Sequence, residues 1–428
     1  MVEARVLSLR NRELFNLVGV GLITGIGFAA VYIALQEEVS AASLSYAGFF
    51  LLLYLTAHTA ARAAVPHADP YLLPIAALLT AVGLTEIYRL EPDNAFRQGL
   101  WIVIGVALFA ATLLVLRHDY RILESYKYLF GVGALVLLGL PALPVIGLTV
   151  NGARLWVELG PLRFQPGEIA KLMLIVFLAG YLREKREVLA QARPKDLGPL
   201  LLIWGGAMLV LVQTNDLGSA LLYFGIFVGM LYAATGRALF VGLGFGLFVA
   251  GAAAAYQAIP RVEERVSIWL DPWQDVEGAG YQLVQSQYSI ANGGFGGTGF
   301  GEGTFTTTAG DPLIPFLNTD FIYSAIAQEL GLIGASALLL LYMVFVVRGF
   351  RTALLAGDGF SKLLATGLTF GFALQTFIIL GGILRLIPLT GITLPFVSYG
   401  GSSVVANFVL LAGLMLVSNR ANALRGAA

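Results

Sequence analysis

Residues 261–320 read RVEERVSIWLDPWQDVEGAGYQLVQSQYSIANGGFGGTGFGEGTFTTTAGDPLIPFLNTD. This is the only long polar interval in a chain that otherwise alternates apolar runs with short connectors. A lipid interior accepts the apolar runs, whereas the polar interval has to lie outside it. We therefore expect a set of membrane helices with one large loop, 259–320, and we expect the chemistry in or beside that loop.

The composition places the chain among membrane proteins. Of its 428 residues, 58% are hydrophobic and 12% are charged, and the mean hydropathy is +0.81. These values lie far outside the usage of soluble proteins. The formal net charge is zero, so no basic face is available to neutralise phosphates, and nucleic-acid binding is not expected.

The residues that commonly hold metals are scarce. Cysteine is absent, which excludes disulfides, thiolate catalysis and cysteine-ligated metals. The three histidines, His58, His67 and His118, are scattered in or beside the first apolar runs. A histidine-rich metal site is therefore not expected, and no metal ligand or cofactor is assigned.

Apolar runs of about 20 residues, the length that crosses a hydrocarbon core about 30 Å thick, number about twelve. They lie near 15–35, 45–65, 71–88, 97–116, 128–148, 166–183, 198–213, 217–235, 238–258, 321–348, 363–387 and 400–418. Neither an internal repeat nor a Pro/Ser-rich linker nor a charge run divides the chain. The sequence thus predicts an all-α polytopic protein with a single transmembrane domain over 1–428.

The basic residues predict the orientation. Most of the 26 lysines and arginines fall in alternate connectors, on the side that also holds the N-terminus. Because cytoplasmic connectors carry an excess of lysine and arginine, both termini are predicted to be cytoplasmic. The 259–320 loop and a smaller loop at 150–165 are then extracytoplasmic.

Three ionisable residues lie at or near helix starts. Pro166 and Glu168 suit the first turn of a helix, and Lys171 shares a face with Glu168 at i, i+3. Asp216 precedes an apolar run and suits an N-cap. Two interpretations stay open for all three: structural caps with a satisfied ion pair, or the lining of a polar cavity at membrane depth.

The first half of the long loop is acidic and flanked by tryptophan. Asp271 and Asp275 lie beside Trp269 and Trp273, and tryptophan favours the membrane interface. An acidic neighbourhood raises the pKa of a carboxyl and makes it a better base. Solvated loop acids and one catalytic aspartate are both compatible with this pattern.

Two further segments are rich in breakers. GGFGGTGFGEG holds GxGxxG-like spacing from Gly294 to Gly299, but neither a strand before it nor a helix after it is evident, so we interpret it as tight backbone and not as a nucleotide site. LRLIPLTGITLPFVSYGGSS is dense in proline and glycine, which predicts backbone buried in protein or lining a cavity. Its one cation, Arg385, fits interfacial snorkelling or an anionic headgroup.

Five motifs occur in a fixed order: NGARLWVELGPLRFQPGEIAK (151–171), NDLGSA (215–220), DPWQDVEGAGYQLVQSQYSIANGGFGGTGFGEG (271–303), TDFIYSAIAQELG (319–331) and PLTGITLPFVSYGGSS (388–403). Together they resemble the SEDS family (shape, elongation, division and sporulation), membrane glycosyltransferases that polymerise peptidoglycan. The resemblance implies a ten-helix core over 69–428 and a two-helix addition over 1–68. The last motif looks somewhat more like the rod-shape members than the division members.

The resemblance implies transfer between two molecules of lipid II, an undecaprenyl-pyrophosphate-linked disaccharide peptide, at the outer face of the bacterial cytoplasmic membrane. It makes Asp275 the essential acid and places Glu168, Lys171 and Asp216 in a central cavity, with Trp273 and Ser398 as further positions. An inverting transfer then needs one base, Asp275, and cations for the departing pyrophosphate. Lys171, Arg154 and Arg385 are the candidates, and a divalent cation is compatible.

The family pattern is not followed everywhere. Asn215 stands where the family often has proline, Phe316 where it often has glutamate, and Gln328 precedes Glu329 where a Glu-Glu pair is common. The resemblance also implies membrane lipids as surroundings and a class B penicillin-binding transpeptidase as partner. Two other functions stay open: a lipid II flippase that uses Glu168, Lys171 and Asp216 as a path, and a scaffold whose loop only binds partners.

Overall fold

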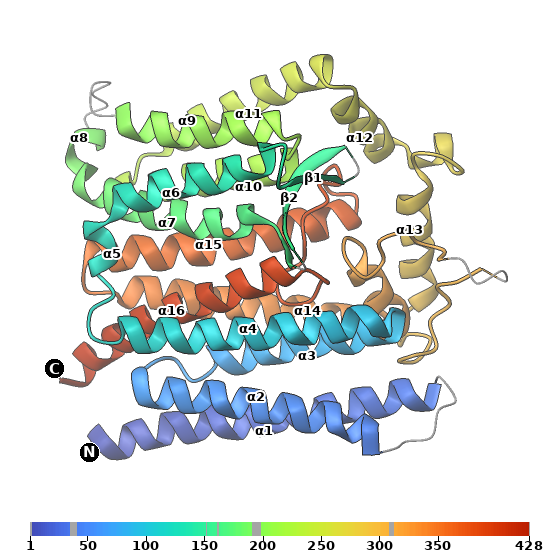
Figure 1. Ribbon diagram of the computed structural model, residues 1–428, viewed down its shortest axis with the longest axis horizontal. Coiled ribbons are helices and arrows are strands. Elements are labelled where there is room, and N and C mark those ends of the chain that lie inside the picture. The colour runs from blue at the N-terminus through green and yellow to red at the C-terminus, as the bar shows by residue number, and fades with distance from the viewer. Residues whose placement is uncertain are drawn as a thin grey trace.

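The computed structural model describes residues 2–34, 41–150, 152–160, 162–190, 198–307 and 312–427. Long helices run side by side, and the chain ends lie together at one end of the bundle (Figure 1). The β-strands and the helices α12 and α13 lie at the opposite end. The polar loop is therefore far from both termini, as the predicted orientation requires.

Apolar helices occupy the predicted positions in the described part of the chain. They are α1 (Val2–Ala34), α2 (Ala41–Ala64), α3 (Leu72–Leu90), α4 (Pro92–Leu116), α6 (Lys127–Gly139), α7 (Pro166–Glu184), α9 (Gly198–Gln213), α10 (Leu217–Thr235), α11 (Ala238–Ala258), α14 (Ile322–Leu355), α15 (Gly359–Ile383) and α16 (Gly401–Ala427). By length and composition, eight of the described helices suffice to cross a membrane. The fold is that of a polytopic membrane protein; twelve spans and cytoplasmic termini stay predictions.

The prediction of an all-α chain is wrong at 147–164. The predicted helix near 128–148 ends early, in a 3-10 turn at Leu140–Ala142, and an antiparallel sheet follows it. Its strands are β1 (Gly147–Val150), β2 (Ala153–Leu159) and β3 (Leu162–Phe164), in the order β1-β2-β3. Gly152 and Gly160, with φ of 73° and 63°, allow the tight turns between the strands.

The long loop is largely helical from 260 to 293. It contains α12 (Pro260–Leu270), the 3-10 turn η3 (Pro272–Asp275) and α13 (Tyr281–Gly293), while α5 (Ile122–Ser125) and α8 (Arg186–Ala190) are short connectors elsewhere. Pro260 and Pro272 each stand in a first helical position, where the missing N–H has no cost. Asp271 accepts a hydrogen bond from the Trp273 N–H at 3.2 Å and so caps η3.

The glycine-rich segment joins a break in α14. Gly331 interrupts that helix with φ 64° and ψ −166°. The N–H groups of Thr298 and Gly299 donate to the carbonyls of Gln328 and Glu329, at 3.0 and 3.1 Å. On the far side of the break, the N–H groups of residues 332 and 333 donate to the carbonyls of residues 294 and 295. The segment thus satisfies backbone groups that the broken helix leaves open.

Helix α1 packs mainly on α3 and helix α2 mainly on α4, and a buried charge cluster lies where the pair meets the rest of the chain. Glu13 lies between Arg10, at 2.6 Å, and the Nδ1 atom of His58, at 2.7 Å, and all three are almost fully buried. Arg10 also donates to the Ala68 carbonyl. Because a buried charge is stable only when it is paired and hydrogen-bonded, this cluster fixes the helix pair to the start of the remaining bundle.

Candidate functional site

The segment between α15 and α16 has no helix, and polar side chains satisfy its buried backbone. The amide of Gln98 donates to the Ser398 carbonyl at 3.2 Å and accepts from the Gly400 N–H at 3.1 Å. Tyr342 donates its hydroxyl to the Pro395 carbonyl at 2.6 Å. Non-helical backbone among membrane helices needs such partners, so the prediction of breakers buried in protein is confirmed here.

One charged pair lies beside this segment. The ammonium of Lys171 lies 2.7 Å from the Glu168 carboxylate and 2.6 Å from the amide oxygen of Gln375. The same Gln375 donates to the Thr393 carbonyl at 3.0 Å. The Lys171 side chain is 3% exposed and that of Glu168 is 11% exposed. The Glu168–Lys171 pair is thus nearly buried and is connected through Gln375 to the non-helical segment 384–400.

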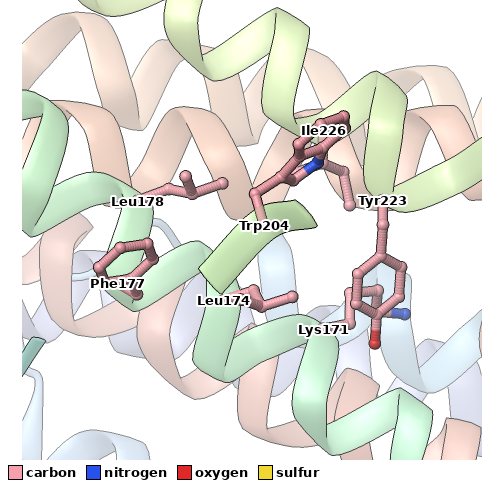
Figure 2. A pocket seen from close by; sticks show the side chains of 7 residues that line it. All are labelled: Lys171, Leu174, Phe177, Leu178, Trp204, Tyr223 and Ile226. Atoms are coloured by element: carbon pink, nitrogen blue, oxygen red, sulfur yellow. The ribbon is translucent and has the colours of Figure 1, made fainter. Parts of the chain in front are cut away.

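A small pocket lies next to the Glu168–Lys171 pair. Its lining comes from α7, α9 and α10 and consists of Lys171, Leu174, Phe177, Leu178, Trp204, Tyr223 and Ile226. Figure 2 shows Lys171 and Tyr223 at one end and Phe177 with Leu178 at the other. The Tyr223 hydroxyl donates to the Gly167 carbonyl at 2.5 Å. The pocket is therefore apolar with one polar end, beside the Glu168–Lys171 pair.

Asp216 caps α10 and lies against the non-helical segment. Its carboxylate accepts from the Ser219 N–H at 3.0 Å, so the N-cap interpretation is correct. A Cβ on Gly218 would lie 2.7 Å from the Thr390 carbonyl oxygen, which shows how closely the two backbones approach. Burial raises the pKa of the Asp216 carboxyl, while the hydrogen bonds from Ser219 lower it.

Arg265 of α12 reaches the same place from the long loop. Its guanidinium donates to the Thr390 carbonyl at 3.2 Å. Burial lowers its pKa, while the nearby carboxylates of Asp320 and Asp216 raise it. Burial also raises the pKa of Asp320 to about 6, against the opposing effect of Arg265. Arg265 thus brings a cation to the point where Asp216, Asp320 and the segment 384–400 meet.

Arg385 holds the end of α12. Its guanidinium donates to the carbonyls of Trp269 and Leu270, at 3.1 and 3.0 Å, and lies 5.0 Å from the Trp273 ring centroid. The indole N–H of Trp269 donates back to the Arg385 carbonyl at 3.0 Å. Neither predicted role, snorkelling or headgroup binding, includes this contact. Arg385 instead caps the C-terminus of α12.

Asp275 lies at the surface of the η3 turn. Its carboxylate accepts from the Ala279 N–H at 2.8 Å, and its carbonyl accepts from the Gly280 N–H at 3.0 Å. The side chain is exposed. Within the described residues, neither a hydrogen bond nor an ion pair joins it to Glu168, Lys171 or Asp216. The structure therefore orders Asp275 on a fixed turn and leaves its carboxylate open.

Arg154 and Ser398 lie in different surroundings. Arg154 is exposed on β2 and donates to the Thr149 hydroxyl at 3.1 Å, while its backbone N–H donates to the Thr214 carbonyl at 3.1 Å. Ser398 is buried, donates to the Thr319 carbonyl at 2.5 Å and accepts from the Leu394 N–H at 3.0 Å. Arg154 is thus open to a ligand, whereas the Ser398 hydroxyl fixes a backbone turn.

The structure gathers some predicted residues and adds others. Glu168 and Lys171 form a pair. Asp216 lies with Arg265 and Asp320, two residues to which the sequence pattern assigned no role. In the described ranges, no group of three His, Cys, Asp or Glu residues could hold a metal ion.

The fold and the site define a helical membrane protein in which paired and buried ionisable side chains meet a non-helical segment, 384–400. The model of the cell cycle protein family named for FtsW, RodA and SpoVE matches residues 71–423, so the chain belongs to this family. The resemblance seen in the five motifs is thereby confirmed.

Two relatives of known name are similar over most of the chain. The chain is 42% identical over 433 residues to the peptidoglycan glycosyltransferase RodA of Mycobacterium tuberculosis, covering 96% of this chain and 91% of that one. It is 34% identical over 362 residues to the stage V sporulation protein E of Bacillus subtilis, covering 82% and 96%. The mycobacterial match extends into the first 70 residues, where the family model has no counterpart.

Two solved structures are similar. A chain of a peptidoglycan synthase complex, described as coordinating polymerization and crosslinking, superimposes with a TM-score of 0.69 at 32% identity, covering 83% of this chain and 98% of that one. The rod shape determining protein RodA of Thermus thermophilus gives 0.59 at 28% identity, covering 82% and 96%. The fold agrees with both over the family core.

Proposed function

We propose that the chain is a peptidoglycan glycosyltransferase that polymerises lipid II at the outer face of the bacterial cytoplasmic membrane. The names of its relatives support the activity. The observation that carries the site is the Asp275 carboxylate, which is exposed on an ordered turn whose Trp273 ring lies 5.0 Å from Arg385, at the start of the segment 384–400. A general base has to reach a substrate hydroxyl, and an open carboxylate on a fixed turn meets that need.

The proposed step is a single inverting displacement. Asp275 takes the proton of the acceptor's GlcNAc 4-hydroxyl, and the hydroxyl oxygen bonds to the anomeric carbon of the donor sugar. The bond from that carbon to the pyrophosphate oxygen breaks, and undecaprenyl pyrophosphate leaves with the electron pair. Because pyrophosphate is a good leaving group, no second carboxyl is required as an acid.

The cations contribute unequally to this proposal. Arg154 is exposed near the outer end, so it is the best placed of the three candidates to meet a phosphate. Arg385 is bound to two carbonyls and a tryptophan ring. Lys171 is paired with Glu168. We assign Lys171, Glu168 and Asp216 to the wall of the substrate cavity, and Trp273 and Ser398 to its shape.

The test uses purified protein and lipid II in detergent. Polymer formed by the wild type without a bilayer supports the enzyme, whereas translocation in liposomes without any polymer supports the flippase. The scaffold function requires no turnover under either condition. Adding the Asp275→Asn variant separates the proposed base from a general defect, provided that this variant purifies as a folded protein.

The proposed partner is a class B penicillin-binding transpeptidase, which would crosslink the strands. A similar chain comes from a complex that couples polymerization to crosslinking. The similarity to mycobacterial RodA supports a role in elongation. Addition of the transpeptidase to the polymerisation assay tests whether it changes the rate.

A further inference from the structure

The first helix, α1, touches the glycine-rich loop at the end of the bundle where Asp275 lies. A Cβ on Gly301 would lie 2.5 Å from the Cβ of Ala34, near the end of α1. Gly301 has φ +92°, which L residues rarely adopt. A Cβ on Gly27 would lie 3.5 Å from the ring of Phe300. Two neighbouring residues of the loop thus sit directly on α1.

The same loop is held from the other side by a buried ion pair. Arg89 of α3 donates to the carbonyls of Gly301 and Gly303, at 2.8 and 2.9 Å. Glu329 of α14 accepts from the N–H groups of the same two glycines, at 2.7 and 3.1 Å, and lies 3.4 Å from Arg89. Gly301 therefore lies between α1 and this pair, which leaves it little freedom to shift.

A short, rigid path leads from this loop to Asp275. The loop begins where α13 ends, and its backbone is bonded into the break of α14. At the other end of α13, a Cβ on Gly280 would lie 2.2 Å from the Pro272 carbonyl oxygen. The Gly280 N–H also donates to the Asp275 carbonyl at 3.0 Å. The start of α13 thus packs directly on the η3 turn.

We propose that the N-terminal helix α1 is a positioning element for the Asp275 turn, acting through Phe300 and Gly301. This inference rests on the proposed polymerase function. Catalysis by a base depends on its placement to within about 1 Å, and a misplacement of that size lowers the rate by up to about 100-fold. Helix α1 contributes no reacting group; it packs on the loop that follows α13.

The test places one bulky residue on α1. Gly27→Leu pushes against the Phe300 ring and against Thr85 of α3, each 3.5 Å from the added Cβ, and Gly19→Leu is the matched control on the same helix, because a Cβ there meets nothing within 4 Å. Phe300→Ala is made alone and combined with Gly27→Leu, since removal of the ring makes room for the leucine. Hydrogen exchange of residues 272–303 and the kcat and KM for lipid II are measured for each full-length protein.

We expect Gly27→Leu to speed exchange in 294–303 and to lower kcat by about tenfold with KM within about twofold, because the turn is displaced while the substrate cavity is intact. Gly19→Leu should behave as the wild type. The combined variant should recover part of the lost kcat relative to Gly27→Leu, a coupling that independent sites would not show.

Three results would overturn the inference: unchanged exchange in Gly27→Leu, equal effects of Gly27→Leu and Gly19→Leu, or a loosened loop with full kcat. If the wild type forms polymer and any of these three results is found, only the positioning role is wrong. If the wild type forms no polymer, the proposed function is wrong, and so is the catalytic part of this inference. The exchange data still test whether α1 and the loop are physically coupled.

Discussion

The ammonium of Lys171 lies 2.7 Å from the carboxylate of Glu168, one turn earlier on α7. Both side chains are nearly buried, and the Gln375 amide oxygen accepts a second hydrogen bond from the ammonium. The two charges thus neutralise each other inside the bundle, and Gln375 connects them to the Thr393 carbonyl. This part of the site is therefore polar but carries no net charge.

Lys171→Met should destabilise the fold by about 3–5 kcal/mol, because it leaves the Glu168 carboxylate buried without its cation. Denaturant unfolding in detergent measures the loss. The double variant Lys171→Met with Glu168→Gln should regain part of it, since the remaining group is neutral. Arg163→Met, which breaks the exposed pair with Glu158, serves as the control and should cost at most about 1 kcal/mol. Equal losses in Lys171→Met and Arg163→Met would contradict this account.

Arg385→Ala should loosen the end of α12 and lower the polymerisation rate several-fold. The variant loses two carbonyl bonds and the contact with the Trp273 ring. Hydrogen exchange over 260–275 reports the loosening directly. Arg385→Lys should not restore the wild-type state, because lysine lacks the planar group that stacks on the indole. Exchange in Arg385→Ala that is as slow as in the wild type would exclude this role of Arg385. The control is Arg351→Ala, which removes an exposed arginine on α14.

Asp320 should make the fold less stable as the pH rises. Its pKa is raised from 3.8 to about 6 in the folded protein, so the folded state binds the proton more tightly than the unfolded state does. The stability that the neutral carboxyl contributes is present below about pH 4 and is lost as the pH rises towards 6. The Asp320→Asn variant should lose this dependence. Melting curves between pH 4.5 and 7.5 test it, and parallel profiles of variant and wild type would refute it.

Gly331→Ala should destabilise the protein by about 1–3 kcal/mol, because alanine strains the backbone at φ 64°. A Cβ there would also lie 2.2 Å from the Gly297 nitrogen. Gly246→Ala in α11 is the matched control, since a Cβ at that helical position meets nothing within 4 Å. It should be neutral or slightly stabilising. The measured difference between the two unfolding midpoints decides the matter.

The apolar runs predicted helices well because each had to match one physical length, the thickness of a bilayer. The sheet at 147–164 was missed because its signal is local. Asn151-Gly152 followed by the alternating stretch ARLWVEL is a hairpin pattern. The 20-residue hydropathy window averages such an alternation away, so the preceding helix was extended into it.

The contacts of the site were less predictable. The pairing of Glu168 with Lys171 follows from their spacing on one helix, and the cap at Asp216 follows from the apolar run after it. Arg265, by contrast, meets Thr390 across 125 residues of chain. Periodicity carries no information on such distant contacts. Periodicity is equally uninformative about the glycine-rich loop that bonds to the break at Gly331, because that contact depends on how α13 and α14 pack.

The central claim is that the Asp275 carboxylate is the base of the polymerisation step. The most direct measurement is the rate of lipid II polymerisation by the purified Asp275→Asn protein, compared with the wild type and with Asp271→Asn, whose side chain only caps η3. We predict that Asp275→Asn forms no polymer although it folds, because the amide cannot take the proton of the hydroxyl. Asp271→Asn should retain most of the activity. Polymer formation by a folded Asp275→Asn protein at a rate near that of the wild type would contradict the account.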